Sequence, residues 1–263
     1  MSNIEKAVII HFGRVGSTIL SQMLNQNSEI ISAGEIYNDK VNKMSELQGK
    51  PWYEIYDNYL DFLDIYYQQS VQKIGSNNYR YYIFEYKPYT EGCEINTESI
   101  FNNFNKEKGI NKFIFLYRKN YLRRLVSVMI SFKTQVWHIN KKQKITDQIN
   151  QVYIDINQVK DGDIGIINKS LLETLESYYE YINYIKKYID FQQGLCLSFE
   201  DDIASNPYKG YRKVCDFLNV KPLSNPEINL KRQNPSSLKE IITNFKEVED
   251  YLKNTNFSPL LED

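Results

Sequence analysis

Short apolar runs alternate along this chain with longer stretches in which apolar residues recur every three or four positions. The short runs predict strands, which we expect at residues 6–12, 29–33, 81–85, 112–117 and 194–199. The longer stretches predict helices, which we expect at residues 17–26, 52–74, 96–106, 120–132, 169–191, 208–218 and 237–253. Between about 132 and 168 the apolar residues follow neither spacing clearly, so no element is predicted there. Strands that alternate with helices are typical of a mostly parallel central sheet flanked by helices, so we predict an α/β fold.

Chain length and composition set outer limits on this fold. The 263 residues could form one large domain or two small ones, and we expect a single domain over 1–263 because no Pro/Gly/Ser-rich linker or repeat divides the chain. The 32 basic and 33 acidic residues give a net charge of −1. This balance argues against nucleic acid or a membrane surface as a partner bound through bulk charge.

The cysteines and the N-terminal region bear on the compartment. Cys93, Cys196 and Cys215 lack C-x-x-C spacing, so we expect free thiols in a reducing environment rather than disulfides or a zinc site. The N-terminal region contains no apolar stretch of signal-peptide or transmembrane length. We therefore expect a cytoplasmic protein. The oligomeric state cannot be read from the sequence.

Candidate chemistry gathers where the expected strands end. Gly13, Glu85–Lys87 and Arg118 each follow or close an apolar run. Parallel sheets bind ligands outside the carboxyl ends of their strands. These residues are therefore expected at one edge of the sheet.

The first strand leads into Gly13-Arg14-Val15-Gly16-Ser17-Thr18 and then into a helix. Glycines let the backbone approach an anion, the helix N-terminus offers N–H groups, and Ser17 and Thr18 add hydroxyls. The run lacks both G-x-x-x-x-G-K-[ST] and G-x-G-x-x-G. We interpret it as a phosphate cradle, the alternative being a strand–turn–helix whose glycines serve geometry alone.

A second junction of this kind begins after the strand at 112–117. It reads Arg118-Lys119-Asn120 and is followed by a helix that carries Ser127. A cation and a hydroxyl near a helix N-terminus suit a phosphate, and either Arg118 or Lys119 could supply the charge. The alternative is a solvated basic helix face.

Taken together, these motifs resemble those of sulfotransferases that use 3′-phosphoadenylyl sulfate (PAPS). The run from Gly13 to Leu20 is similar to the family's 5′-phosphosulfate loop. Arg118 and Ser127 match its 3′-phosphate motif, with Lys119 where that motif has a second arginine. Leu195–Asp202 resembles the family's late strand ending in (Y/F)-E-D, and 215–220 resembles its F-L-G-V segment. The resemblance spans about residues 6 to 250 and is weakest at 38–80 and 138–170.

The resemblance implies a P-loop-NTPase-like sulfotransferase fold and a specific reaction. The sulfuryl group of PAPS would pass to a hydroxyl or amine of a small-molecule acceptor, such as a natural product or a sugar, leaving 3′,5′-ADP. The reaction does not require a metal, and the sequence has no evident metal-ligand motif. The residues that would bind the donor are Arg14, Val15, Gly16, Ser17, Thr18, Arg118, Lys119, Ser127, Arg232 and Gln233.

The catalytic assignment follows the family branches that use a glutamate base, among them the bacterial, carbohydrate and tyrosyl types. Glu35, in Ser32-Ala33-Gly34-Glu35, matches that glutamate, while Arg14 and Lys87 would stabilise the transferring group and the leaving oxygen. The alternative base is a histidine. His138 could line the acceptor pocket, whereas His11 lies in the first strand and is expected to pack. The pocket residues expected from this assignment are Glu35, Tyr37, Trp137 and His138.

Two other classes of function remain open at this point. An ATP-dependent phosphate-loop kinase would need Mg²⁺ and the lysine–serine/threonine pair that this loop lacks. A binding module without catalytic activity would bind 3′,5′-ADP and sulfate no acceptor.

Overall fold

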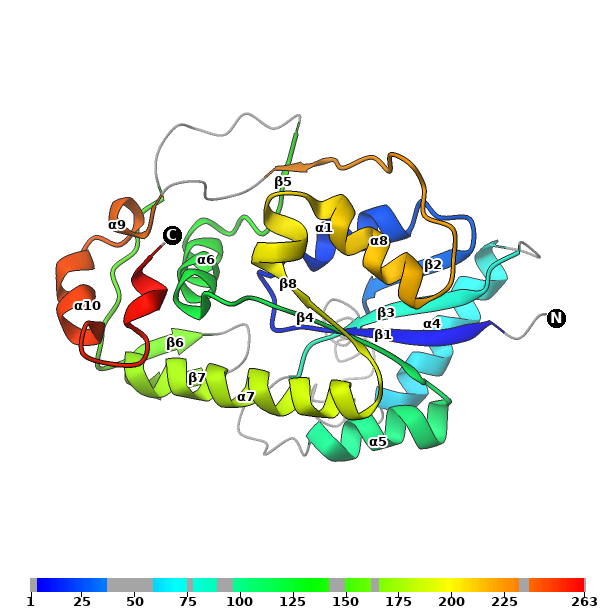
Figure 1. The fold of residues 1–263 in the computed structure, drawn as a ribbon, viewed down its shortest axis with the longest axis horizontal. Coiled ribbons are helices and arrows are strands. Elements are labelled where there is room, and N and C mark those ends of the chain that lie inside the picture. The colour runs from blue at the N-terminus through cyan, green and yellow to red at the C-terminus, as the bar shows by residue number, and fades with distance from the viewer. Residues whose placement is uncertain are drawn as a thin grey trace, which may run out of the picture.

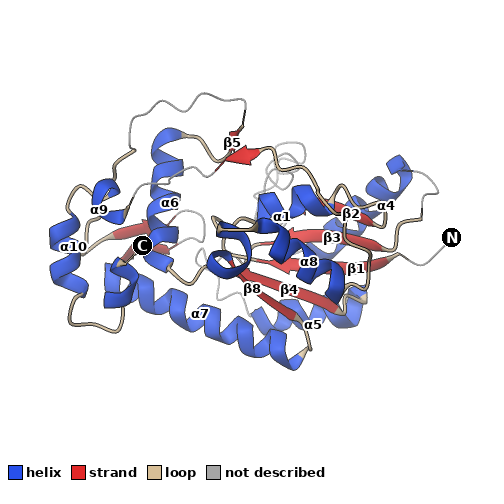
Figure 2. Cartoon of the chain, turned by 45° about the horizontal axis from the view of Figure 1, so that its top comes forward, coloured by secondary structure: helices blue, strands red, loops and turns tan. Residues whose placement is uncertain are grey.

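A five-stranded, all-parallel sheet forms the centre of the molecule. The computed structural model describes residues 4–36, 59–74, 78–88, 97–141, 150–161, 166–231 and 237–262. The strands, in their order across the sheet, are β2 (Ile30–Glu35), β3 (Tyr81–Tyr86), β1 (Glu5–Ile10), β4 (Lys112–Tyr117) and β8 (Leu195–Ser198). The predicted α/β class is confirmed, and every pairing in the central sheet is parallel (Figure 2).

Helices cover both faces of this sheet. One face packs on α1 (Ser17–Leu24) and α8 (Pro207–Phe217). The other face packs on α4 (Tyr59–Ile74), α5 (Thr97–Lys108) and α7 (Leu171–Phe191). Figure 1 shows the sheet between these two layers.

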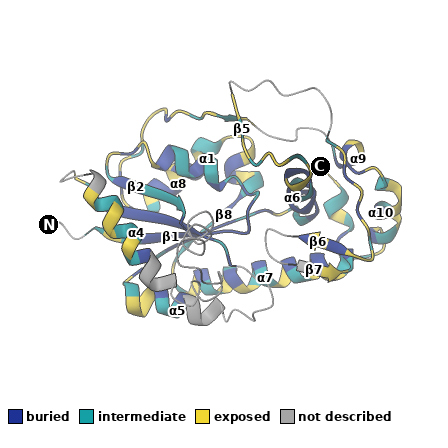
Figure 3. Ribbon diagram, turned by 180° about the vertical axis from the view of Figure 1, so that it is seen from behind, coloured by how far each residue is buried: buried dark blue, intermediate teal, exposed yellow. Residues whose placement is uncertain are grey.

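The middle strands of the sheet, β3, β1 and β4, are buried on both sides because most of their residues are apolar. In β1, Ala7 and Ile9 belong to the core under α1 and α8, while Val8 and Ile10 belong to the core under α5 and α7. All four residues are inaccessible to solvent, and the ribbon of β1 carries the colour of buried residues in Figure 3. Burial on both faces explains why these strands appear in the sequence as continuous apolar runs rather than alternating ones.

A smaller group of elements lies beyond the carboxyl ends of the strands (Figure 1). Its main helix is α6 (Tyr121–Thr134), which packs beside η2 (Ser258–Leu261). The remaining elements of the group are β5 (Ile139–Asn140), β6 (Val159–Asp161), β7 (Ile166–Lys169), β9 (Leu230–Lys231), α9 (Leu238–Ile241) and α10 (Phe245–Leu252). The strands form two antiparallel pairs, β5 with β9 and β6 with β7. One further turn, η1 (Phe199–Ala204), connects β8 to α8.

The structure corrects one expected helix. Residues 237–253 form two helices, α9 and α10, rather than one. The break occurs because the chain pairs with a distant segment: the Thr243 N–H donates to the Val152 carbonyl, and Asn244 hydrogen-bonds both backbone groups of Ile154. Helical periodicity alone does not reveal such a tertiary contact.

None of the helices within the described residues is both long enough and apolar enough to span a bilayer.

Candidate functional site

The parallel strands bring the predicted site residues to one edge of the sheet. Glu35 closes β2 and lies opposite Glu85 of β3, after a β-bulge that follows Ser32. Lys87 and Arg118 come directly after β3 and β4. Four separate stretches of sequence therefore meet where β1 enters its glycine loop.

The loop after β1 has an unusual backbone. Gly13, Arg14 and Gly16 all have positive φ angles, of 75°, 54° and 85°. Glycine tolerates this region, whereas an arginine there is strained. A Cβ on Gly16 would approach Ile203 Cγ2 to 2.7 Å, so Gly16 is required for space as well as for conformation. Gly16 is the N-cap of α1 and has no side chain with which to cap it, which leaves backbone N–H groups facing the loop.

Arg14 connects the two predicted anion motifs. Its Nε donates to Ser127 Oγ at 3.0 Å, and its Nη1 donates to the Trp137 carbonyl at 2.6 Å. The Trp137 ring packs edge-on against Phe132, with centroids 5.0 Å apart. The glycine loop and the middle of α6 are thus joined through one guanidinium.

Glu35 and Lys87 form an ion pair at the same edge. Their charged atoms are 3.0 Å apart, and the side chains are 31% and 10% exposed, respectively. His138 lies in the same electrostatic environment. Burial lowers the pKa of His138 below its usual value, Arg14 and Lys87 lower it further, and Glu35 partly opposes them. The imidazole is therefore held in its neutral form near neutral pH.

A buried carboxylate lies beneath the loop. The Gly13 N–H donates to His11 Nδ1 at 3.0 Å, which places the ring proton on Nε2. Nε2 is 2.9 Å from Glu85 Oε2 and donates to it. Burial raises the pKa of Glu85, but hydrogen bonds from His11, Ser21 and Ser17 outweigh it, so the net pKa falls below the usual range. Glu85 is therefore a buried carboxylate whose negative charge is stabilised by hydrogen bonds from the protein.

This hydrogen bonding decides how the acidic cluster is interpreted. Potential metal-ligand atoms of His11, Glu35 and Glu85 lie within 4.8 Å of one another, a spacing that would suit a metal ion. Both ring nitrogens of His11 are engaged by Gly13 and Glu85, and Lys87 binds Glu35. A metal would have to break these bonds, so we assign the cluster to hydrogen bonding.

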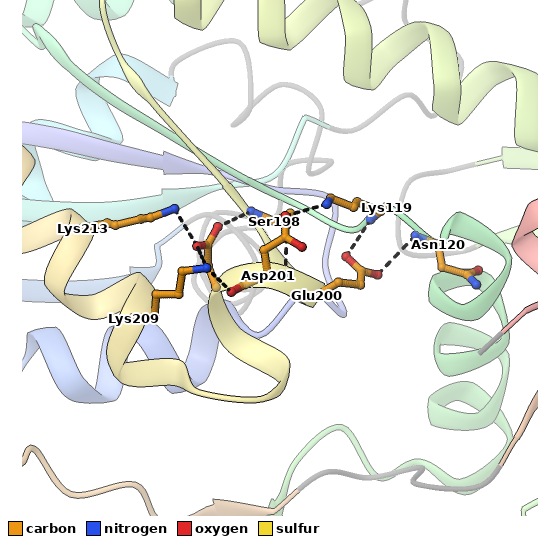
Figure 4. Close-up of polar contacts among 8 residues, drawn as sticks. Lys119, Asn120, Ser198, Glu200, Asp201, Lys209 and Lys213 are labelled. Carbon is orange, nitrogen blue, oxygen red and sulfur yellow. Dashed lines mark hydrogen bonds and ion pairs between the residues drawn. The ribbon is translucent and has the colours of Figure 1, made fainter.

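Arg118 and Lys119 point to different surroundings. Arg118 is 9% exposed, its Nη1 donates to the Arg14 carbonyl at 3.4 Å, and its guanidinium lies over the Phe199 ring. Lys119 is 51% exposed and binds the Asp201 carboxylate at 2.5 Å (Figure 4). The hydrogen bond that the Lys119 ammonium donates to Asp201 raises the pKa of Lys119. Of the two cations, Arg118 is the one that faces the loop.

The other predicted site residues are placed unevenly. Val15 is buried in the core under α1 and α8, so only its backbone can serve a ligand. Thr18 lies half-buried in the first turn of α1. The Ser17 hydroxyl bonds Glu85 rather than facing outward. Tyr37, Arg232 and Gln233 lie outside the described residues.

Sequence reasoning gave no role to Glu85 or Ser21. The available signal was a single carboxylate in an otherwise aromatic and apolar strand, YYIFEY. A buried charge needs dedicated partners, which marks such a position as functional or structural. Its partners could not be inferred, because His11 is 74 positions away in the chain.

No family model matches the chain, and searches of curated proteins and of solved structures found no match either. The evidence for a function therefore lies in the geometry of the site. Among the described residues, the site combines the cations Arg14, Lys87 and Arg118 with a glycine loop at a helix N-terminus. Glu35 and His138 are the groups there that could accept the acceptor's proton.

Proposed function

We propose that this protein is a sulfotransferase that moves the sulfuryl group of PAPS to a hydroxyl or amine of a small-molecule acceptor. The observation that carries this proposal is the junction of its two anion motifs. Arg14 of the glycine loop bonds Ser127 of α6, and Arg118 reaches the Arg14 carbonyl. A ligand with phosphates at two positions would fit such a joined site.

The donor would lie along this junction. Backbone N–H groups of residues 14–18 and the Thr18 side chain would hold the 5′-phosphosulfate at the start of α1. Arg118 and Ser127 would hold the 3′-phosphate through charge-assisted hydrogen bonds. Lys119 is left out of this assignment because its ammonium binds Asp201.

The chemistry would proceed by in-line displacement. The acceptor atom forms a bond to sulfur while the bond from sulfur to the bridging oxygen of the 5′-phosphate breaks. Glu35 would take the acceptor's proton, and 3′,5′-ADP would leave with the bridging oxygen. Arg14 and Lys87 would stabilise the charge that develops on the sulfuryl group and on that oxygen. His138, neutral through its lowered pKa, is the competing base.

A turnover assay tests this proposal. The protein is incubated with PAPS and a panel of small alcohols, phenols, sugars and amines, and 3′,5′-ADP release and acceptor mass are followed. We expect acceptor-dependent release of 3′,5′-ADP together with a sulfated product. Phosphorylated product from ATP and Mg²⁺ would instead establish a kinase. Tight 3′,5′-ADP binding without turnover on any acceptor would establish a binding module.

A further inference from the structure

Glu200 lies where the end of β8 meets the start of α6. Its Oε2 accepts from the Lys119 N–H at 2.9 Å, and its Oε1 accepts from the Asn120 N–H at 3.2 Å (Figure 4). These N–H groups precede the first turn of α6, where a negative charge is favourable. A carboxylate of the chain itself thus fills the place where an anion would otherwise be attracted.

The same carboxylate contacts Arg118. Glu200 Oε1 is 3.5 Å from Arg118 Nε. The Phe199 ring covers the guanidinium at 4.6 Å from its centroid, and the Arg14 carbonyl accepts from Nη1. The Arg118 guanidinium is therefore contacted on one face by Phe199, at Nε by Glu200 and at Nη1 by the Arg14 carbonyl.

Phe199 also contacts the glycine loop. A Cβ added to Gly16 would come within 3.2 Å of the Phe199 ring. The turn η1 consequently packs against both predicted phosphate elements, the loop after β1 and the arginine after β4.

We infer that Glu200 is a positioning residue that sets the selectivity for a 3′-phosphate, an inference that rests on the proposed function. It orients the Arg118 guanidinium toward the Arg14–Ser127 side and closes the N-terminus of α6 to phosphates. A planar guanidinium binds phosphate well only in a fixed orientation. Loss of the carboxylate would both free Arg118 and expose N–H groups that bind any phosphate, and both effects lower the discrimination.

The test compares two nucleotides on matched variants. Affinities for 3′,5′-ADP and 5′-ADP are measured by calorimetry for the wild type, Glu200→Gln and Asp201→Asn. Gln keeps the size and one acceptor oxygen of Glu200, which favours normal folding. Asp201 is the neighbouring carboxylate on η1, and it is half exposed and paired with Lys119.

We expect the preference of Glu200→Gln for 3′,5′-ADP over 5′-ADP to fall about tenfold, the worth of one charge-assisted hydrogen bond. Asp201→Asn should keep the wild-type ratio. General destabilisation would weaken both nucleotides alike and leave the ratio unchanged. A folded Glu200→Gln protein with the wild-type ratio overturns this inference alone, whereas a wild type without preference overturns the proposed function and this inference with it.

Discussion

At the scale of single residues, the site is defined by the side chains that face the glycine loop. Arg14 adopts a strained backbone conformation, and its guanidinium donates hydrogen bonds to Ser127 and to the Trp137 carbonyl. Arg118 lies beside it, while its neighbour in sequence, Lys119, is drawn to the surface by Asp201. Adjacent cations thus have separate roles that the sequence left open.

The first prediction compares these two cations. Arg118→Ala should weaken binding of 3′,5′-ADP about tenfold or more, because it removes a charge-assisted contact to the 3′-phosphate. Lys119→Ala should change that affinity little, since its ammonium is already paired on the surface. Calorimetric titration of both variants measures the difference. A larger loss in Lys119→Ala would reverse the assignment.

The second prediction concerns the base. Glu35→Gln should lower kcat by about 10²- to 10⁴-fold, the usual contribution of a general base, with 3′,5′-ADP affinity unchanged. Glu29→Gln is the matched control, because Glu29 is ion-paired to Arg80 at 3.0 Å, next to the opposite end of β2. Steady-state kinetics with PAPS provide the measurement.

The result that would contradict this prediction is that His138, rather than Glu35, acts as the general base. Because its pKa is lowered from 6.5, a catalytic His138 would lose activity only as the pH falls below that value. A large loss of kcat in His138→Gln, together with near-normal turnover in Glu35→Gln, would transfer the role of base to His138. The acid limb of the pH–rate profile would then lie below pH 6.5.

At the scale of elements, two buried polar networks hold the loop to its surroundings. In the first, His11 and Glu85 tie the end of β1 to β3 and, through Ser21, to α1. In the second, Arg124 of α6 donates to the Phe12 carbonyl and binds Asp161 of β6, with Tyr178 of α7 beside it. Each network stabilises the loop only if all of its members are present.

The third prediction tests the second network. Asp161→Asn should destabilise the protein by about 3–5 kcal/mol, because it leaves the buried Arg124 charge without its carboxylate. Asp250→Asn is the control, since Asp250 pairs with two exposed lysines, Lys246 on α10 and Lys253 directly after it. That variant should unfold at nearly the wild-type denaturant midpoint. Equal midpoints for both variants would show that the buried pair does not hold this region together.

The fourth prediction follows from the lowered pKa of Glu85. A depressed carboxyl pKa contributes stability above its ordinary value of 4.5, and this contribution is lost as the pH falls through the folded-state pKa. Glu85→Gln should therefore be less stable than the wild type at pH 7, and the difference should shrink in acid. Urea unfolding from pH 7 to about 3 measures this, and a pH-independent difference would contradict it.

At the scale of the whole molecule, the fold was readable and part of the site was not. Apolar runs predicted the five central strands to within two residues at every end. The short strands between 139 and 169 were missed, because two to four residues carry no periodicity and depend on distant partners. The sequence placed Lys87 at the edge where the strands end, but it did not predict the ion pair with Glu35, because that pair joins residues distant in the chain.

The central claim concerns the whole site, namely that its two anion motifs bind one ligand with a 3′-phosphate. The measurement that tests it most directly is a calorimetric titration of the wild-type protein with 3′,5′-ADP, with 5′-ADP, and with ATP plus Mg²⁺. We predict that 3′,5′-ADP binds at least about tenfold more tightly than either 5′-ADP or ATP, which corresponds to a free-energy difference of about 1.4 kcal/mol or more. ATP binding as tightly as 3′,5′-ADP, or more tightly, would contradict the account and favour a kinase.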